Sequence, residues 1–161
     1  MPAMNISSGE RCAVAGTNRQ NILLGRTVTT RSPAETQALA AVLAGKLKPG
    51  AVLALHGELG SGKTCFVQGL AAALGVEGIV NSPTFTIINE YRGRIRLYHV
   101  DLYRVKSEAE FQGLGLEELH SCGGITAIEW PEIFARLLPA ETLHLHFEYV
   151  DESRRRIRIG G

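Results

Sequence analysis

The segment Gly57–Thr64 (GELGSGKT) constrains this chain more than any other, because it matches the phosphate-loop pattern G-x-x-x-x-G-K-[ST] at every position. Glycines allow the backbone to wrap its amides around phosphate oxygens, and successive N–H groups then form a nest that binds anions. A continuous apolar run, Ala51–His56, precedes the segment, and a helical pattern over Lys63–Leu74 follows it. The motif requires this order of strand, loop and helix, so the sequence predicts a nucleotide-binding loop.

Each polar position of the loop has an expected role. Lys63 carries the charge that meets the β and γ phosphate oxygens, and the hydroxyl of Thr64 is placed to ligate Mg²⁺. The loop alone does not distinguish ATP from GTP, or a kinase from an ATPase. The residues expected to contact the nucleotide here are Glu58, Leu59, Gly60, Ser61, Gly62, Lys63, Thr64 and Cys65.

The segments around the loop indicate an α/β fold with a mixed sheet. Short apolar runs at Ala51–His56 and Ile125–Ile128 are typical of strands buried on both faces. Two hairpins are expected as well, so part of the sheet must be antiparallel. We therefore predict a three-layer α/β P-loop NTPase domain with a mixed parallel and antiparallel sheet. The other expected strands are Arg26–Thr30, the hairpin Thr84–Tyr91 with Ile95–Val100, and the hairpin Leu143–Val150 with Arg155–Ile159.

A helix is predicted to begin after Ser32, where Ser-Pro-Ala-Glu forms a capping box with proline at the first helical position. Its apolar face is expected at Leu39, Val42, Leu43 and Leu47, and the stretch 48–50 (Lys-Pro-Gly) is expected to end it. Shorter helices are predicted at Glu108–Gly113, Leu116–His120 and Pro131–Leu137.

Composition sets the limits of the domain. The chain has 161 residues and a formal net charge of +1, which excludes a protein built around one large basic or acidic surface. Its three cysteines have no paired spacing, which suits a reducing cytosol, and no apolar run approaches a membrane span. We expect a cytoplasmic protein without membrane contact, with residues 1–25 as a flexible extension and 26–161 as one domain.

Two carboxylates follow predicted strands and are candidates for holding Mg²⁺ and its water. Glu129 comes directly after the run Ile125–Ile128, and Asp101 follows a second apolar run. Ligands bind at the carboxyl ends of strands in open α/β sheets, although either residue is equally explained as a solvated strand end or a helix cap. His99 should share a face with Asp101 and is interpreted as a structural hydrogen-bonding residue. Trp130, the single tryptophan, is either a packed aromatic anchor or a wall beside the nucleotide.

Three further segments accompany the phosphate loop in a fixed order. They are NSPTFT at 81–86, HVDLYR at 99–104 and IEWP at 128–131. In this order and spacing, from Thr27 to Ile159, the chain resembles the TsaE (YjeE) family. That family is the bacterial ATPase needed for threonylcarbamoyladenosine modification of tRNA.

The resemblance implies roles for individual residues. Thr64 and Glu129 would be the magnesium-binding positions. Asp101 would be the acidic residue essential for hydrolysis, orienting the attacking water, with Lys63 beside it as the second catalytic residue.

The resemblance also assigns residues around the nucleotide. Trp130 would be an aromatic beside it, Thr84 would lie in a switch-like loop, and Arg154 falls where the family places a basic residue. Arg154 is followed by two more arginines, any of which can occupy that place. In the family a second threonine commonly follows Gly-Lys-Thr, and in this chain that residue is Cys65. Its backbone amide can still bind a phosphate, so we expect only a modest effect on nucleotide affinity.

The implied activity is Mg²⁺-dependent ATP hydrolysis, slow in isolation, on behalf of a partner threonylcarbamoyl-transferase complex of TsaB- and TsaD-like proteins. Contact with tRNA would then be indirect. Two other functions stay open. The first is a nucleotide-dependent binding module without significant turnover, in which an acidic residue aimed at the γ-phosphate would be superfluous. The second, ranked last, is a small-molecule kinase, which would need an arginine-rich lid.

Overall fold

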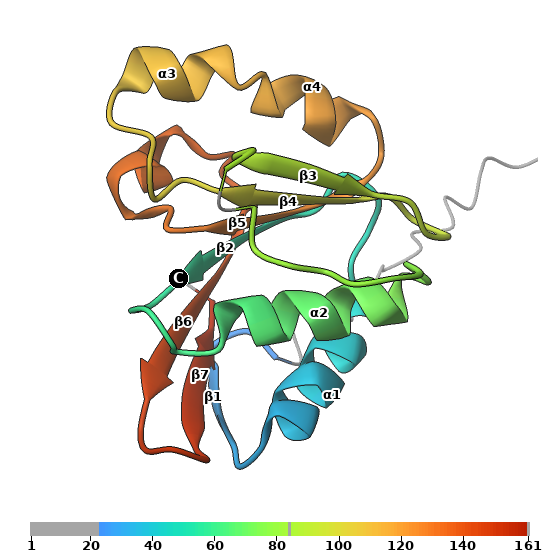
Figure 1. The fold of residues 1–161 in the computed structure, drawn as a ribbon, viewed down its shortest axis with the longest axis vertical. Coiled ribbons are helices and arrows are strands. Elements are labelled where there is room, and N and C mark those ends of the chain that lie inside the picture. The colour runs from blue at the N-terminus through green and yellow to red at the C-terminus, as the bar shows by residue number, and fades with distance from the viewer. Residues whose placement is uncertain (1–22, 84, 161) are drawn as a thin grey trace, which may run out of the picture.

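The computed structural model describes residues 23–83 and 85–160. Seven strands, four α-helices and one 3₁₀ helix, η2, make up this part of the chain (Figure 1). In chain order they are β1 (Arg26–Thr30), α1 (Pro33–Ala44), β2 (Val52–His56), α2 (Lys63–Ala73), β3 (Ile88–Tyr91), β4 (Leu97–Asp101), α3 (Glu108–Gly113), α4 (Leu116–Ser121), β5 (Ile125–Glu129), η2 (Glu132–Leu137), β6 (Leu143–Tyr149) and β7 (Arg155–Ile159).

All seven strands form one sheet in the order β1-β7-β6-β2-β5-β4-β3. The central strands β6, β2, β5 and β4 run parallel, whereas β3 pairs antiparallel with β4, and β7 pairs antiparallel with both β6 and β1. The two predicted hairpins therefore lie on opposite sides of a parallel centre. The predicted α/β fold with a mixed parallel and antiparallel sheet is confirmed.

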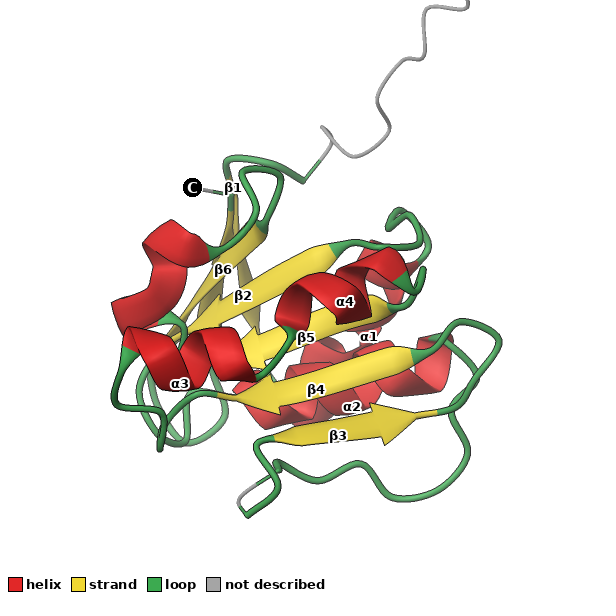
Figure 2. Ribbon diagram, turned by 90° about the horizontal axis from the view of Figure 1, so that it is seen from above, coloured by secondary structure: helices red, strands yellow, loops and turns green. Residues whose placement is uncertain are grey.

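Helices cover both faces of the sheet and make three layers (Figure 2). Alternation along β2 shows how the layers are sorted, because Leu53 and Leu55 belong to the core beneath α1 and α2. Val52 and Ala54 belong to the second core, beneath α3, α4 and η2. Both faces of β2 are thus buried, as its continuous apolar run predicted.

Helices α1 and α2 pack closely at Gly69. A Cβ atom at this position would lie 2.4 Å from Cα and 2.6 Å from the carbonyl oxygen of Gln37, which is backbone and cannot move aside. Only glycine permits this approach, so Gly69 sets the distance between α1 and α2, the helix that begins at the phosphate loop.

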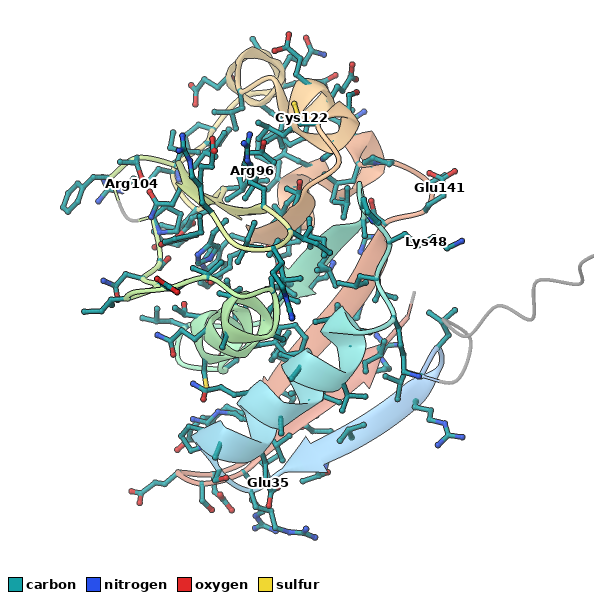
Figure 3. The ribbon with its side chains drawn as sticks, turned by 90° about the vertical axis from the view of Figure 1, so that its right-hand side faces the viewer. Glu35, Lys48, Arg96, Arg104, Cys122 and Glu141 are labelled. Atoms are coloured by element: carbon teal, nitrogen blue, oxygen red, sulfur yellow. The ribbon has the colours of Figure 1, made fainter. Side chains whose placement is uncertain are left out.

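The predicted start of α1 is confirmed. The Ser32 hydroxyl accepts a hydrogen bond from the Glu35 amide at 3.1 Å, and the Glu35 carboxylate accepts one from the amide of Arg31, one residue before the cap. Glu35 lies at this end of the helix, beside the end of β1 (Figure 3). The predicted apolar face was wrong at Val42, which is 54% exposed, because Ala40 and Ala44 point to the core instead. The helix also ends at Ala44, before the predicted stop.

The first hairpin is shorter than predicted, because β3 begins at Ile88. Ile87 has a φ of 63°, a left-handed conformation that a strand does not contain. The Thr86 hydroxyl donates to the side-chain oxygen of Asn89 at 2.6 Å and closes a turn there. The predicted helix at Pro131–Leu137 is a 3₁₀ helix.

The predicted extension, residues 1–25, falls mainly on residues outside the described part of the chain. Of its described residues, Leu23 and Gly25 form a turn, in which the Gly25 amide donates to the carbonyl oxygen of Ile159 at 2.7 Å. The domain boundary stays a prediction. Over residues 23–83 and 85–160, no helix has the length and apolar character to cross a bilayer.

Candidate nucleotide-binding site

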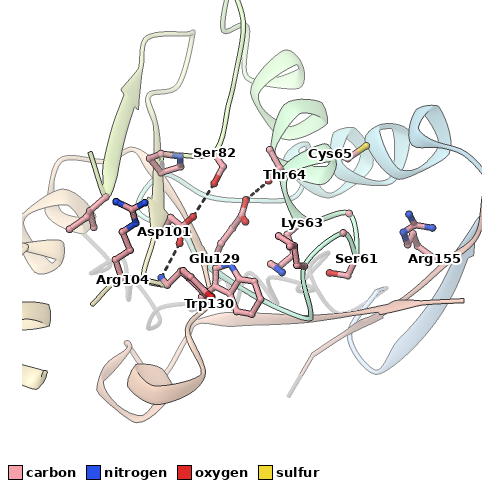
Figure 4. Close-up of a pocket in the computed structure, with 16 residues that line it drawn as sticks. Ser61, Lys63, Thr64, Cys65, Ser82, Asp101, Arg104, Glu129, Trp130 and Arg155 are labelled. Carbon is pink, nitrogen blue, oxygen red and sulfur yellow. Dashed lines mark hydrogen bonds between the residues drawn. The ribbon is translucent and has the colours of Figure 1, made fainter. Parts of the chain in front are cut away.

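A cavity of about 670 Å³ opens where β2, β4 and β5 end (Figure 4). These three strands are parallel, so their carboxyl ends meet at one edge of the sheet, the usual location of ligands in such folds. The lining residues come from the phosphate loop, from the ends of β4 and β5 with the segments that follow them, from the segment before β3, and from β7. They are Leu59, Gly60, Ser61, Gly62, Lys63, Thr64, Cys65, Ser82, Pro83, Ile87, Asp101, Tyr103, Arg104, Glu129, Trp130 and Arg155.

The backbone of the phosphate loop depends on two glycines. Gly57 has a φ of 141°, and a Cβ atom there would lie 2.5 Å from the carbonyl oxygen of Phe147. Gly62 has a φ of 100° and is the N-cap of α2, without any side chain to cap the helix. The first amides of α2 are therefore free to meet an anion at the positive end of the helix.

Lys63 is buried, and its charge is held inside the loop. Its ammonium group donates to the carbonyl oxygens of Gly57 and Glu58, the second at 2.9 Å, and lies 4.0 Å from the centroid of the Trp130 ring. Desolvation lowers the pKa of Lys63, while nearby carboxylates, Glu129 foremost, act in the opposite direction. A desolvated ammonium gains more from anionic phosphate oxygens than an exposed one, because its attraction to them is less screened.

Thr64 and Glu129, the two residues expected to bind magnesium, are in direct contact. The Thr64 hydroxyl donates to Oε1 of Glu129 at 3.0 Å, and the Glu129 side chain is buried at the end of β5. Mg²⁺ in phosphate sites is held by one or two protein oxygens together with phosphates and water, so this pair suits it. The described residues contain no cluster of three or more His, Cys, Asp or Glu side chains that would bind a metal without phosphates.

Asp101 lies beside Glu129, because the two are register partners at the ends of β4 and β5. Both carboxylate oxygens of Asp101 are held: Oδ2 accepts from the Ser82 hydroxyl at 3.0 Å, and Oδ1 accepts from the amide of Tyr103 at 2.9 Å (Figure 4). A carboxylate with both oxygens fixed is oriented before any ligand arrives.

Trp130 lines the cavity instead of the hydrophobic core. Its φ of 58° turns the chain sharply after Glu129, and its ring packs on Tyr103 with centroids 5.1 Å apart. Backbone strain of this kind is found at functional sites, where the surrounding structure enforces it. Trp130 therefore forms a wall of the cavity, and its place beside a nucleotide stays a prediction.

The structure places Arg155, and not Arg154, at the cavity. Side chains alternate along β7, so Arg155 shares a face with the buried Ile157 and points toward the phosphate loop. The side chain of Arg154 lies outside the lining and pairs with Asp151 at 2.6 Å. Of the adjoining arginines that the resemblance left open, Arg155 is thus the one that lines the cavity, and which of them meets the nucleotide stays a prediction. Arg155 also lies over the ring of Tyr149, 4.6 Å from its centroid, which keeps its guanidinium in place.

Other expected contacts differ in position. Glu58 is not in the lining but supports Lys63 through its carbonyl oxygen, and Leu59 is 89% exposed at the tip of the loop. Cys65 lines the cavity, and burial raises the pKa of its thiol more than Gln37 and Arg155 lower it. Thr84 falls outside the described residues.

Comparison with known proteins agrees with this geometry. The sequence model of the family described as "Threonylcarbamoyl adenosine biosynthesis protein TsaE" matches residues 30–157. The chain belongs to the TsaE family. It is 45% identical over 129 residues to the tRNA threonylcarbamoyladenosine biosynthesis protein TsaE of Bacillus subtilis, covering 80% of each chain. It is 38% identical over 130 residues to TsaE of Treponema pallidum, covering 81% of this chain and 96% of that protein.

A solved TsaE-like structure has the same fold. The crystal structure of YdiB from Bacillus subtilis superposes with a TM-score of 0.70 at 38% identity, covering 82% of each chain. The resemblance expected from the three motifs is therefore confirmed over most of the described residues, and family and fold together imply nucleotide binding. TsaE proteins are those required for tRNA threonylcarbamoyladenosine biosynthesis.

Proposed function

We propose that this chain binds ATP with Mg²⁺ and hydrolyses it slowly, as the ATPase subunit of tRNA threonylcarbamoyladenosine biosynthesis. One observation carries the proposal: the phosphate-loop lysine Lys63, the pair Thr64 and Glu129, and the oriented carboxylate of Asp101 lie in a single cavity. These groups supply the positioning and charge stabilisation that phosphoryl transfer to water requires.

Each residue has one task in the proposed reaction. Lys63 and the amides of the loop hold the β and γ phosphate oxygens, and Thr64 with Glu129 would hold Mg²⁺, which neutralises developing charge when bound. Asp101 orients the attacking water and accepts its proton. A bond forms from the water oxygen to the γ phosphorus while the bond to the bridging oxygen breaks, giving ADP and inorganic phosphate.

The proposed partner is the threonylcarbamoyl-transferase complex, with TsaB- and TsaD-like subunits, and contact with tRNA is through that complex in the cytoplasm. Membership of the TsaE family supports this pathway. The rim of the cavity supports a protein partner, since Leu59 and Tyr103 are lining residues with largely exposed side chains. Phe85 is 85% exposed and has the guanidinium of Arg104, another lining residue, 5.0 Å from its ring. Exposed apolar groups gathered around a site are typical of interaction surfaces.

The test is phosphate release by the purified chain, alone and with the TsaB–TsaD complex, for the wild type and Asp101→Asn. We expect slow release alone, stimulation by the complex, and loss of both in the variant despite retained ATP binding. Release that does not depend on Asp101 or on the complex would favour the binding-module function. Rapid transfer that requires an added small-molecule acceptor would instead indicate a kinase.

A further inference from the structure

His99 is a fully buried polar side chain that the proposed reaction has not used. It lies on β4, and its Nε2 atom is 2.9 Å from Oε1 of Glu129 on the neighbouring strand β5. In the strand register His99 lies opposite Ala127, two residues before Glu129 on the same face, so the contact runs diagonally between the strands. The face is that of α2, which also carries Thr64.

The hydrogen-bonding pattern defines the state of the ring. A carboxylate oxygen only accepts, so Nε2 of His99 must donate its proton to Oε1 of Glu129. The other ring nitrogen, Nδ1, is buried without a hydrogen-bond partner in the described part of the chain. A proton on Nδ1 would be a buried donor left unsatisfied, which is costly, so the hydrogen bonds favour the tautomer with its proton on Nε2.

The consequence falls on Glu129. Its Oε1 atom accepts two hydrogen bonds, one from His99 on the β4 side and one from Thr64 on the α2 side. Its Oε2 atom accepts none from the described residues and is the oxygen left to bind a cation or its hydration water. Held by two donors on one oxygen, the carboxylate cannot rotate freely.

We propose that His99 is a positioning residue for magnesium: its Nε2–H fixes the Glu129 carboxylate and thereby sets the Mg²⁺ affinity of the nucleotide complex. This inference rests on the proposed function, because it presumes that Thr64 and Glu129 bind the metal. Hydrogen bonds from behind a ligating group orient it, and losing one typically costs about 10- to 100-fold in metal affinity.

The test compares two amides that place their donor differently. The variant H99Q puts a side-chain NH₂ near the site of Nε2, whereas the side-chain NH₂ of H99N reaches only the site of Nδ1. Thr126→Val is the matched control: Thr126 is fully buried on β5, and its hydroxyl has no partner in the described part of the chain, so the change leaves Glu129 untouched. The affinity for the non-hydrolysable analogue AMP-PNP is measured by calorimetry with Mg²⁺ and with EDTA.

We expect H99N to lose about 10- to 100-fold of the magnesium-dependent affinity, with no change in EDTA, while H99Q and T126V stay near the wild type. Equal loss with Mg²⁺ and in EDTA would overturn the proposal, since His99 would then be merely structural. An H99N variant that keeps the full magnesium effect would also overturn it. If Mg²⁺ does not raise the affinity of the wild type for AMP-PNP, the proposed function itself is wrong. That result is distinguishable from a failure of the His99 proposal, in which the wild type responds to Mg²⁺.

A second measurement needs no variant and applies even where H99N does not fold. Long-range nitrogen–proton correlation spectra of the ¹⁵N-labelled wild-type chain report which ring nitrogen carries the proton. A neutral ring protonated at Nε2 supports the proposal. A neutral ring protonated at Nδ1 would remove the donor to Glu129 and overturn it.

Discussion

The ammonium nitrogen of Lys63 lies 4.0 Å from the centroid of the Trp130 ring, so the phosphate loop and the segment after β5 meet through a cation–π contact. The contact is desolvated, because Lys63 is only 4% exposed. Such contacts strengthen when water is excluded. The only indole of the chain therefore lies in direct contact with the lysine of the phosphate loop.

Binding of ATP is expected to change the fluorescence of Trp130. Phosphate oxygens compete with the ring and the loop carbonyls for the charge of Lys63, which alters the field at the indole. Titration with MgATP should give a saturating change in emission, and Lys63→Ala should abolish it. Flat emission across a titration that saturates by calorimetry would place the nucleotide away from Trp130.

Arg155→Ala should weaken ATP binding by about 10- to 100-fold, the usual cost of losing a charged hydrogen bond. The neighbouring Arg154→Ala is the matched control, because its guanidinium pairs with Asp151 outside the cavity and should leave affinity unchanged. Calorimetric titration with MgATP compares the two variants. If Arg154→Ala weakened MgATP binding more than Arg155→Ala, Arg154 would be the residue that contacts the nucleotide.

Asp101→Asn and Glu129→Gln should separate turnover from metal binding. The first is expected to bind MgATP normally but to lose about 10²- to 10⁴-fold in turnover, since the water-orienting carboxylate acts only in the transition state. The second should require more Mg²⁺ for the same affinity. Single-turnover phosphate release at several Mg²⁺ concentrations distinguishes them, and identical magnesium profiles would show that the roles are not divided in this way.

Gly69→Ala should destabilise the fold by about 1–3 kcal/mol, as overpacking of a close contact usually does. The new Cβ atom would meet the backbone of Gln37 and push α1 away from α2. Gly113→Ala in α3 is the control, because no atom lies within 4 Å of its added Cβ, and it should stabilise by about 0.4–1 kcal/mol. Urea unfolding measures both, and equal effects would contradict the packing argument.

Stability should fall on mild acidification because of His56. Desolvation first, then the nearby His146 and His144, lower its pKa to about 4, and its contact with Glu132 at 3.6 Å does not offset this. In the unfolded chain His56 titrates near 6.5. Between these values the unfolded state binds more protons than the folded state, so stability is intact above pH 6.5 and is lost as pH falls toward 4.

The expected loss between pH 7.5 and pH 5 is about 1–2 kcal/mol. The variant His56→Gln keeps an amide that can donate to His144, which lies 2.8 Å from His56, but it cannot titrate. Urea unfolding at the two pH values should show a smaller difference for this variant than for the wild type. An unchanged difference would assign the pH dependence to other groups.

Local patterns predicted much of this molecule. The phosphate loop with β2 and α2, the capped start of α1 and the bounds of α3 depend on nearest neighbours, and they were predicted with small errors in the boundaries. The carboxyl ends of buried strands also pointed to Asp101 and Glu129, which the structure brings together. These features were accessible because strand ends and glycine-rich turns have strong local signals.

Other features depend on contacts that local patterns do not contain. The strand expected from Thr84 begins at Ile88, because the left-handed Ile87 interrupts it and its apolar composition does not reveal that. Whether Arg154 or Arg155 lines the cavity depends on which residues of β7 share a face with the buried Ile157. The hydrogen bond between His99 and Glu129 could be predicted only from the order and register of β4 and β5, which no local pattern gives.

The pairing of β1 with β7 has a consequence for synthesis on the ribosome. Strand β1 is translated first among the seven, yet β7, with which it pairs among the described strands, is the last of them to emerge. Until β7 arrives, the edge of β1 is unpaired and Arg155, which β7 carries, is missing from the cavity. Nascent chains should thus complete their sheet and their nucleotide site in the same late step, so tight binding of ATP would mark a polypeptide whose translation has passed β7.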